Sequence, residues 1–386
     1  MPNELHLRKF VAPEIVFGVG ARHLAGRYAQ NLGARKVLVV TDPGIIEAGW
    51  TKQVLDSLGD VGVPYAVFDG LTPNPKTHEV MAGTEFYRKN RCDVIIAVGG
   101  GSVIDCAKGI GIVDSNGAHI ATFEGVDKVG VPIAPLVCIP TTAGSSADVS
   151  QFAVIKDPNR KSKFAIASKA LVPDVALIDP ITITTMPRYL SACTGLDTLT
   201  HAIEAFVSNA SSPLTDIHAL EAVRLISEYL LPSLENPDDI VIRSKVMLAT
   251  MEAGLAFSNA ILGAVHAMAH ALGGLMELPH GECNAILLES VIDFNYSSVP
   301  DRYASIAEAM GIDISGMTVA ELKTALLSKI RDIRIRAGVV RGLKDIGVEP
   351  AHISELSAKA LEDVCIATNP ISPTLTEVGD IFYAAL

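Results

Sequence analysis

Two pairs of metal-binding side chains stand one helical turn apart in segments that otherwise read as apolar helix. Asp197 and His201 are spaced i, i+4 in GLDTLTHAIEAFV, and His266 and His270 repeat that spacing in GAVHAMAHALGG. Residues at this spacing project from one face of a helix, so each pair presents its two side chains together. His280 follows a proline, at a turn that can bring its imidazole back toward the same point.

Imidazole and carboxylate donors suit a divalent ion such as iron, zinc, cobalt or nickel, and they allow open coordination positions. Each histidine taken alone has packing or hydrogen bonding as its alternative. Together they favour a shared ligand, because burying so many ionisable groups in apolar helices is costly. Cys283 is a further candidate ligand, but a thiolate would make the site softer than its neighbours indicate. Spacing does not decide which of His266 and His270 binds the metal.

The helix that carries His266 and His270 is expected to end at Gly273 and Gly274, because glycine commonly terminates helices. Pro279 then sets up the turn that precedes His280. This arrangement places all the candidate ligands between residues 197 and 280.

Length and charge exclude several classes of protein. A chain of 386 residues is long for one domain and comfortable for two, and a net charge of −12 without a basic cluster argues against nucleic acid. The N-terminal MPNELHLRKF has no apolar core typical of a targeting segment, and no run reaches the ~18 apolar residues of a membrane span. Six cysteines without a C-x-x-C pair indicate reduced, mostly buried thiols. We expect a cytoplasmic protein.

The two halves of the chain differ in pattern. Up to about Pro180, short β-branched runs alternate with helical stretches, which predicts βαβ units around a mostly parallel sheet. After about residue 186 strands give way to long helices. We therefore predict an α/β nucleotide-binding domain over 1–185 and an all-helical metal-binding catalytic domain over 186–386, packed together with a cleft between them. The expected helices are 190–208, 213–231, 239–258, 262–274, 284–294, 300–310, 319–336, 351–363 and 376–386.

A glycine-rich turn is the best candidate for cofactor binding. No G-x-G-x-x-G is present, but DVIIAVGGGS runs from an apolar strand into three glycines and a helix. Backbone N–H groups of Gly99–Ser102 at a helix N-terminus would suit a diphosphate. The alternative is an ordinary turn with Ser102 as helix N-cap. Asp42, at the end of the strand KVLVVT, would accept from a ribose 2′-hydroxyl and favour NAD over NADP, or would simply cap the helix that begins at Pro43.

The segments GLDTLTHAIEAFVS and HAMAHALGG…PHGECNAILL resemble the iron-dependent, or group III, alcohol dehydrogenases, and the match extends over nearly the whole chain. The resemblance implies a dehydroquinate synthase-like architecture, with Asp197, His201, His266 and His280 as metal ligands and His270 near the nicotinamide. One departure is Ser145-Ser146-Ala147-Asp148, where many members continue Thr-Gly-Ser-Glu. The cofactor-binding residues expected on these grounds are Asp42, Asn74, Gly99, Gly100, Gly101, Ser102, Thr141, Thr142, Ser145 and Lys163.

The combined reading predicts an NAD-dependent dehydrogenase in which a divalent metal, Fe²⁺ first and Zn²⁺ second, polarises the oxygen of a small primary alcohol or diol. His270 would be the catalytic acid–base residue. Phe152, Phe257 and Leu262 are candidates for an apolar substrate pocket. We expect a homodimer or higher homo-oligomer without a nucleic-acid or membrane partner. The alternatives are a related polyol (glycerol-type) dehydrogenase, a cyclising enzyme as in dehydroquinate synthases, a metallohydrolase or a noncatalytic binding protein.

Overall fold

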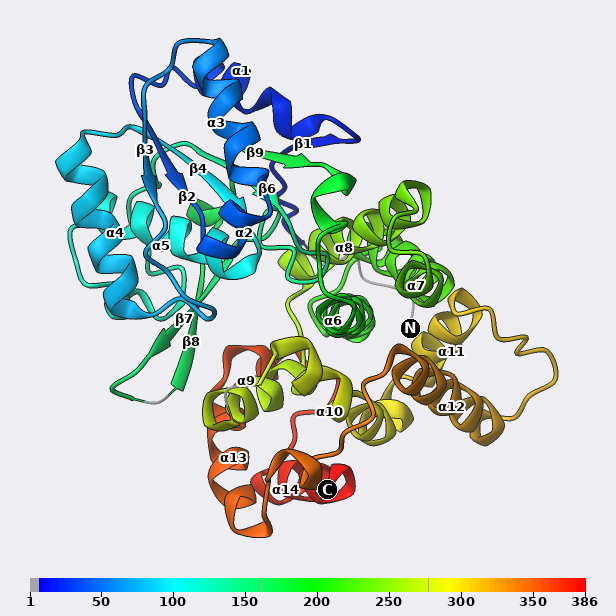
Figure 1. The fold of residues 1–386 in the computed structure, drawn as a ribbon. Helices are drawn as coiled ribbons and strands as arrows, with labels where there is room; N and C mark the ends of the chain where they lie inside the picture. Colours follow the sequence, from blue (N-terminus) through cyan, green and yellow to red (C-terminus); the bar gives the residue numbers. More distant parts are fainter. Residues whose placement is uncertain (1–6, 161, 277) are drawn as a thin grey trace.

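The N-terminal half is built on a parallel sheet. In the computed structural model, which describes residues 7–160, 162–276 and 278–386, six strands pair in parallel in the order β1-β9-β6-β4-β2-β3 (Figure 1). The predicted mostly parallel sheet is thus confirmed; residues 1–6, where much of the N-terminal prediction falls, lie outside the described chain. The strands are β1 (Glu14–Phe17), β2 (Val37–Val40), β3 (Tyr65–Phe68), β4 (Val94–Gly99), β6 (Leu136–Pro140) and β9 (Val175–Ile178).

Helices cover both faces of this sheet, which is why its central strands are apolar on both sides. Side chains alternate along a strand, so Val37 and Val39 pack with Trp50 on one face, whereas Leu38 and Val40 join the other core. Helices α1 and α3 belong to the first core, and α4 and α5 to the second. Their bounds, with the short α2, are α1 (Ala25–Asn31), α2 (Pro43–Glu47), α3 (Trp50–Asp60), α4 (Thr77–Asn90) and α5 (Gly101–Asn116).

A second, three-stranded sheet reaches toward the helical half. Strands β7 (Phe152–Asp157) and β8 (Ser162–Ala167) form an antiparallel hairpin, and β5 (Gly125–Val126) pairs with β8. The run around β7 was predicted, but β8 was not, because SKFAIA is short and begins with two polar residues. In Figure 1 the hairpin points from the main sheet toward α9. It therefore carries Lys163 to the boundary between the halves.

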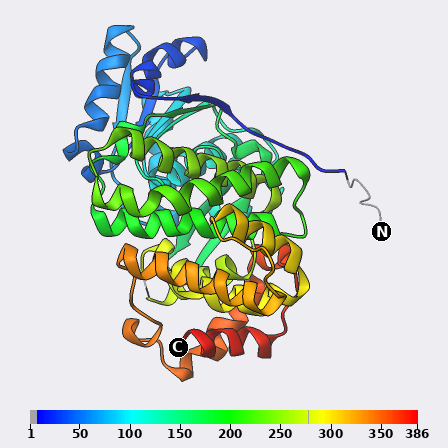
Figure 2. The same cartoon turned by 90° about the vertical axis from the view of Figure 1, so that its right-hand side faces the viewer.

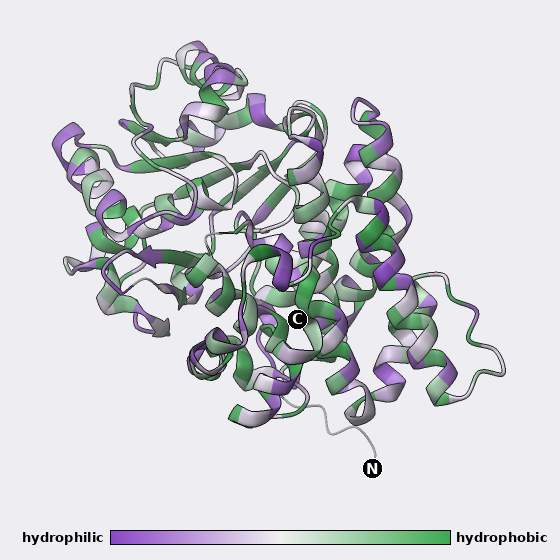
Figure 3. Cartoon of the chain, turned by 60° about the horizontal axis from the view of Figure 1, so that its bottom comes forward, coloured by the Kyte–Doolittle hydropathy of each residue, from purple (hydrophilic) through white to green (hydrophobic). Residues whose placement is uncertain are grey.

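The C-terminal half is helical and shares one large core. Figures 1 and 2 show α6 between the sheet and the lower helices, and Figure 3 shows apolar residues concentrated along the central strands and inner helices. The predicted boundary at 185/186 falls between the 3₁₀ helix η4 (Pro180–Ile183) and α6, and it stays a prediction. The helices are α6 (Arg188–Val207), α7 (Pro213–Glu235), α8 (Ile240–Ala260), α9 (Ala264–Met276), α10 (His280–Asn295), α11 (Pro300–Ala309), α12 (Val319–Ala337), α13 (Pro350–Glu362) and α14 (Leu375–Ala385).

Two helix boundaries near the predicted ligands were wrong. Helix α9 continues through Gly273 and Gly274 to Met276, and α10 begins at His280 rather than at 284. A Cβ on Gly273 would lie 3.8 Å from both the Cys283 sulfur and Lys163 Nζ. Both separations are ordinary van der Waals contacts, so a Cβ would fit at this position, and the helix does not end at the glycine.

The length and hydropathy of the helices test the prediction that no segment spans a membrane. Within the described ranges, no single helix has the length and hydropathy to cross a membrane; α8 and α9 meet that test only together and are bent by 101° at their joint. All six cysteines are free and buried.

Candidate metal and cofactor site

Three helices bring the four predicted metal ligands together. Asp197 and His201 lie on α6, His266 lies on α9, and His280 opens α10. One ligand atom from each of the first three lies within 4.8 Å of the others. His280 Nε2 is 3.8 Å from Asp197 Oδ1. These separations suit donors that each approach one ion at roughly 2.0–2.2 Å.

The Asn284 amide marks the point on which these atoms converge. Its Nδ2 lies 2.6 Å from Asp197 Oδ1, 3.0 Å from His266 Nε2 and 3.2 Å from His280 Nε2. His201 Nδ1 is buried and has no hydrogen-bond partner within the described part of the chain. One carboxylate oxygen and two imidazole nitrogens gathered around one point, with a further imidazole nitrogen unpaired, fit a divalent cation.

Glu204 holds His266 in place from behind. Its carboxylate accepts from the Val265 N–H at 2.7 Å and lies 2.5 Å from His266 Nδ1. The opposite ring nitrogen, Nε2, is therefore turned toward Asp197, 3.7 Å away. A carboxylate that fixes the far nitrogen of a histidine typically sets the tautomer and basicity of a metal ligand. Sequence reasoning missed Glu204, although a glutamate one turn after His201 in an apolar helix was a usable signal.

The four predicted ligands differ in the direction in which their surroundings shift their pKa values. Burial opposes the charge of Asp197, but His201 and His280 outweigh it and hold the pKa of Asp197 well below its usual range. Burial lowers the pKa of His201 to about 3 and also lowers the pKa of His280. For His266 burial is outweighed by Asp197 and Glu204, which raise its pKa to about 9. The centre thus offers an ionised carboxylate and two neutral imidazoles, the forms that bind metals, whereas His266 carries a proton at neutral pH that a metal would have to displace.

His270 has a different environment from the predicted ligands. Its ring stacks on His280 with centroids 5.2 Å apart and stands edge-on to His266 at 6.1 Å. Its Nδ1 lies 2.7 Å from Oδ2 of Asp363, a residue that sequence reasoning did not single out. One nitrogen of His270 is therefore already occupied by a carboxylate.

The glycine-rich turn is packed against the loop that follows β6. A Cβ on Gly100 would lie 2.9 Å from Thr142 Cγ2, and one on Gly101 would lie 2.7 Å from Ser145 Oγ. Gly100 is the N-cap of α5, and no side chain caps it, so the alternative of Ser102 as N-cap is wrong. An uncapped helix N-terminus at a turn without side chains fits a diphosphate.

Lys163 and Asn74 connect this turn to the metal centre. Lys163 Nζ donates to Asn74 Oδ1 at 2.8 Å, and the Asn74 N–H donates to Ser102 Oγ at 3.0 Å. Asn74 adopts φ 58°, an uncommon value for a residue other than glycine. Burial lowers the pKa of Lys163, while the charge of Asp197 acts in the opposite direction. Lys163 also lies beside Gly273 of α9, so it stands between the glycine turn and the helix that carries His266.

Three further predicted residues have clear structural partners. Asp42 caps α2 by accepting from the Ile45 N–H at 3.0 Å, ahead of Pro43. The capping alternative is thus realised, and ribose recognition by Asp42 stays a prediction. Phe257 stacks on His201 at a centroid distance of 4.3 Å, and Phe152 lies 6.0 Å from Phe257.

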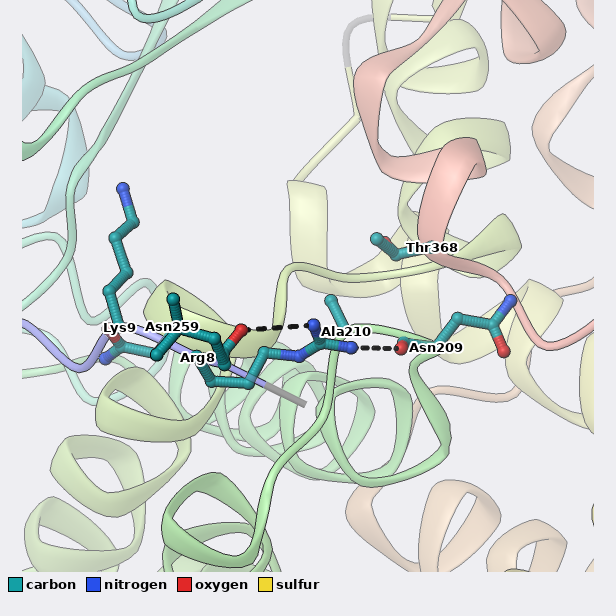
Figure 4. A pocket seen from close by; sticks show the side chains of 7 residues that line it. Arg8, Lys9, Asn209, Ala210, Asn259 and Thr368 are labelled. Atoms are coloured by element: carbon teal, nitrogen blue, oxygen red, sulfur yellow. Dashed lines mark hydrogen bonds between the residues drawn. The ribbon is translucent and has the colours of Figure 1, made fainter. Parts of the chain in front are cut away.

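A hollow of about 380 Å³ lies at the N-terminal segment, where Arg8 donates to the Asn209 carbonyl (Figure 4). It is lined by Leu7, Arg8, Lys9, Asn209, Ala210, Asn259 and Thr368. This set contains none of the predicted site residues.

Comparison with known proteins covers both halves of the chain. Residues 12–180 match the family model of iron-containing alcohol dehydrogenase, and residues 191–386 match that of the Fe-containing alcohol dehydrogenase family, C-terminal. A 1,3-propanediol dehydrogenase of Klebsiella pneumoniae is 37% identical over 97% of this chain and 98% of its own length. An NAD-dependent methanol dehydrogenase of Bacillus methanolicus is 36% identical over 98% of this chain and 99% of its own length. The crystal structure of a 1,3-propanediol oxidoreductase superposes with a TM-score of 0.96 at 36% identity, over 99% of this chain and 100% of that one.

Proposed function

The chain belongs to the iron-containing alcohol dehydrogenases, and from this premise we propose that it interconverts a small primary alcohol or diol with its aldehyde, using NAD and one divalent metal ion. The observation that carries the proposal is the chain of hydrogen bonds from the glycine turn through Asn74 to Lys163, whose charge acts on Asp197 and His280 of the ligand cluster. A metallohydrolase would need the cluster but would leave the glycine turn without a ligand.

The metal is proposed to be held by Asp197, His201, His266 and His280. When bound, it supplies a Lewis acid that polarises the alcohol oxygen. Glu204 keeps the His266 ring in the orientation that directs Nε2 inward. Because the chain belongs to an iron-containing family, we propose Fe²⁺ as the working ion, and Zn²⁺ as a competitor that a set of nitrogen and oxygen donors also accepts.

The cofactor is proposed to lie with its diphosphate at the N-terminus of α5. The N–H groups of Gly100 and Gly101 would face the phosphates, and Thr141, whose buried Oγ1 has no partner among the described residues, would add a hydroxyl. Thr142 and Ser145 extend this wall, and Lys163 is proposed to bind near the nicotinamide. Asp42 is proposed to bind the adenosine ribose with the carboxylate oxygen that the helix cap leaves free.

His270 is proposed to take the alcohol proton. In the oxidation, the O–H bond breaks as the C–H hydride leaves for NAD⁺, and the electron pair of the O–H bond completes the carbonyl. The proton passes to the imidazole and then to water. A positioned base of this kind typically contributes roughly 10²–10⁴ in rate.

The substrate is proposed to be small because the metal centre has an aromatic wall. Phe257 covers one face of His201, and Phe152 lies behind it. Relatives named for 1,3-propanediol and methanol support short alcohols. The reducing compartment indicated by six free, buried cysteines, and a homo-oligomeric state, stay predictions.

A direct spectrophotometric assay tests the proposal. Purified protein, stripped with a chelator and reloaded with Fe²⁺, Zn²⁺ or Co²⁺, is given NAD and a panel of C1–C4 alcohols and diols, and absorbance of the reduced cofactor is followed. We expect turnover only in the metal-loaded samples. Full activity of the stripped protein would exclude the metal mechanism, and failure of every loaded sample with all substrates would exclude the dehydrogenase assignment.

A further inference from the structure

Asp363 lies at the joint between α13 and the 3₁₀ helix η7 (Val364–Thr368), and it meets His270 across 93 residues of sequence. Its Oδ1 accepts from the Cys365 N–H at 2.8 Å and so caps η7, while Oδ2 lies 2.7 Å from His270 Nδ1. Each carboxylate oxygen has its own partner. The side chain is therefore held in one orientation from both ends.

The protonation of this pair follows from its surroundings. Burial opposes the charge of Asp363, but His270 and the N–H of Cys365 outweigh it and lower the pKa of Asp363 to about 2. An ionised carboxylate only accepts hydrogen bonds, so Nδ1 of His270 must carry the hydrogen. Nε2 is then the nitrogen that is left to receive a proton.

A second metal ion is the rival explanation for this cluster. One ligand atom from each of His270, Asp363 and Cys365 lies within 4.8 Å of the others. Such an ion would require the Cys365 thiolate, whereas burial and the charge of Asp363 raise the pKa of Cys365 well above its usual value. Both Asp363 oxygens are also engaged already. These facts favour a hydrogen-bonded network.

Resting on the dehydrogenase function proposed above, we propose that Asp363 is a positioning residue, which holds His270 in the tautomer with hydrogen on Nδ1 and keeps Nε2 available to the alcohol. When the proton of the alcohol moves to Nε2, His270 becomes an imidazolium beside a carboxylate that stays ionised. The charge of Asp363 stabilises this imidazolium, and the proton then leaves from Nε2 to water. The same arrangement orients the histidine of serine proteases.

Asp363→Asn tests the tautomer directly. The asparagine oxygen keeps the hydrogen bond to the Cys365 N–H, so its NH₂ group faces His270 Nδ1 as a donor. The hydrogen of the imidazole is then forced onto Nε2, and we expect kcat to fall by roughly 10²-fold while KM for NAD and metal content stay unchanged. Thr368→Val is the matched control, because it removes the hydrogen bonds from Thr368 Oγ1 to the Leu262 and Cys365 carbonyls at the other end of η7 and leaves the Asp363–His270 contact in place. It should retain kcat.

A second measurement does not depend on the variant folding. In zinc-loaded enzyme labelled with ¹⁵N-histidine, with His270→Ala used to identify the signal, we expect hydrogen on Nδ1 of wild-type His270 and on Nε2 in Asp363→Asn. Wild-type His270 with hydrogen on Nε2 would overturn the assignment, as would Asp363→Asn enzyme that keeps kcat within about threefold of wild type. Wild-type protein that never oxidises alcohols with NAD would refute the proposed function instead, and the tautomer would still decide the role of Asp363.

Discussion

The metal-binding part and the proposed nucleotide-binding part of the site differ in construction: side chains form the first, and backbone forms much of the second. On the metal side, side chains converge and are fixed by other buried side chains, as Glu204 and Asn284 fix His266. On the proposed nucleotide side, the part of the wall that would face the diphosphate is backbone, and what matters there is the absence of side chains at Gly100 and Gly101. A wall of side chains should fail in steps as its hydrogen bonds are removed, whereas a wall of backbone should fail when any atom is added.

The largest difference is expected between two histidines one turn apart on α9. His266→Ala should lose the metal and with it roughly 10³-fold or more in turnover, since Lewis-acid stabilisation is worth several kcal/mol. His270→Ala should keep the metal and lose roughly 10²–10⁴ in turnover. Metal analysis of both purified variants checks this. Equal depletion in the two would make His270 a ligand and would remove the distinction between them.

Glu204→Gln tests whether the metal wall depends on its supporting carboxylate. The amide keeps the shape but removes the charge that holds His266 Nδ1. Loss of such a partner typically costs about 10–100-fold in metal affinity. Competition with a coloured chelator measures this, and affinity for NAD should not change. Unaltered metal affinity would show that the ligands are positioned without Glu204.

Gly101→Ala tests the backbone wall. The added Cβ would lie 2.7 Å from Ser145 Oγ, and an overpacked contact costs about 1–3 kcal/mol, so we expect NAD affinity to fall by about tenfold with metal content unchanged. Gly59→Ala in α3 is the control, because a Cβ there meets nothing within 4 Å. That variant should gain about 0.5–1 kcal/mol in stability. Calorimetric titration with NAD decides, and equal affinities in the two variants would contradict the packing argument.

Features that follow from a local pattern, on either side of the site, could be predicted from the sequence. The i, i+4 pairs at Asp197 and His266 were visible because helical periodicity converts spacing into a shared face. The strand before Gly99 was visible because buried parallel strands are continuous apolar runs. These local regularities also predicted the bounds of the helices of the second half to within two residues, apart from the end of α7 and the start of α10, which each differ by four.

Contacts between distant segments could not be read in this way. Asp363 meets His270 only because η7 folds back onto α9, and no local pattern encodes that meeting. The same holds for Lys163, whose strand β8 depends on pairing with β7. Asn284 could have been predicted, since it repeats the i, i+4 spacing from His280. It was not singled out because an amide is a less common metal-site residue than a histidine.

The smallest expected effect belongs to Asp42, where the two interpretations coexist. Asparagine caps helices about as well as aspartate, so Asp42→Asn should keep the bond to the Ile45 N–H and the stability of α2 while removing the negative charge. If that charge faces the ribose, it repels a 2′-phosphate, and a partly exposed like-charge contact is worth about 1 kcal/mol. The ratio of kcat/KM for NADP to that for NAD should therefore rise about fivefold. Asp239→Asn, which caps α8 through Val241 and Ile242 in the helical half, controls for the loss of one charge. A ratio that stays the same in both variants would leave Asp42 as a helix cap alone and would place ribose recognition on another residue of the backbone wall.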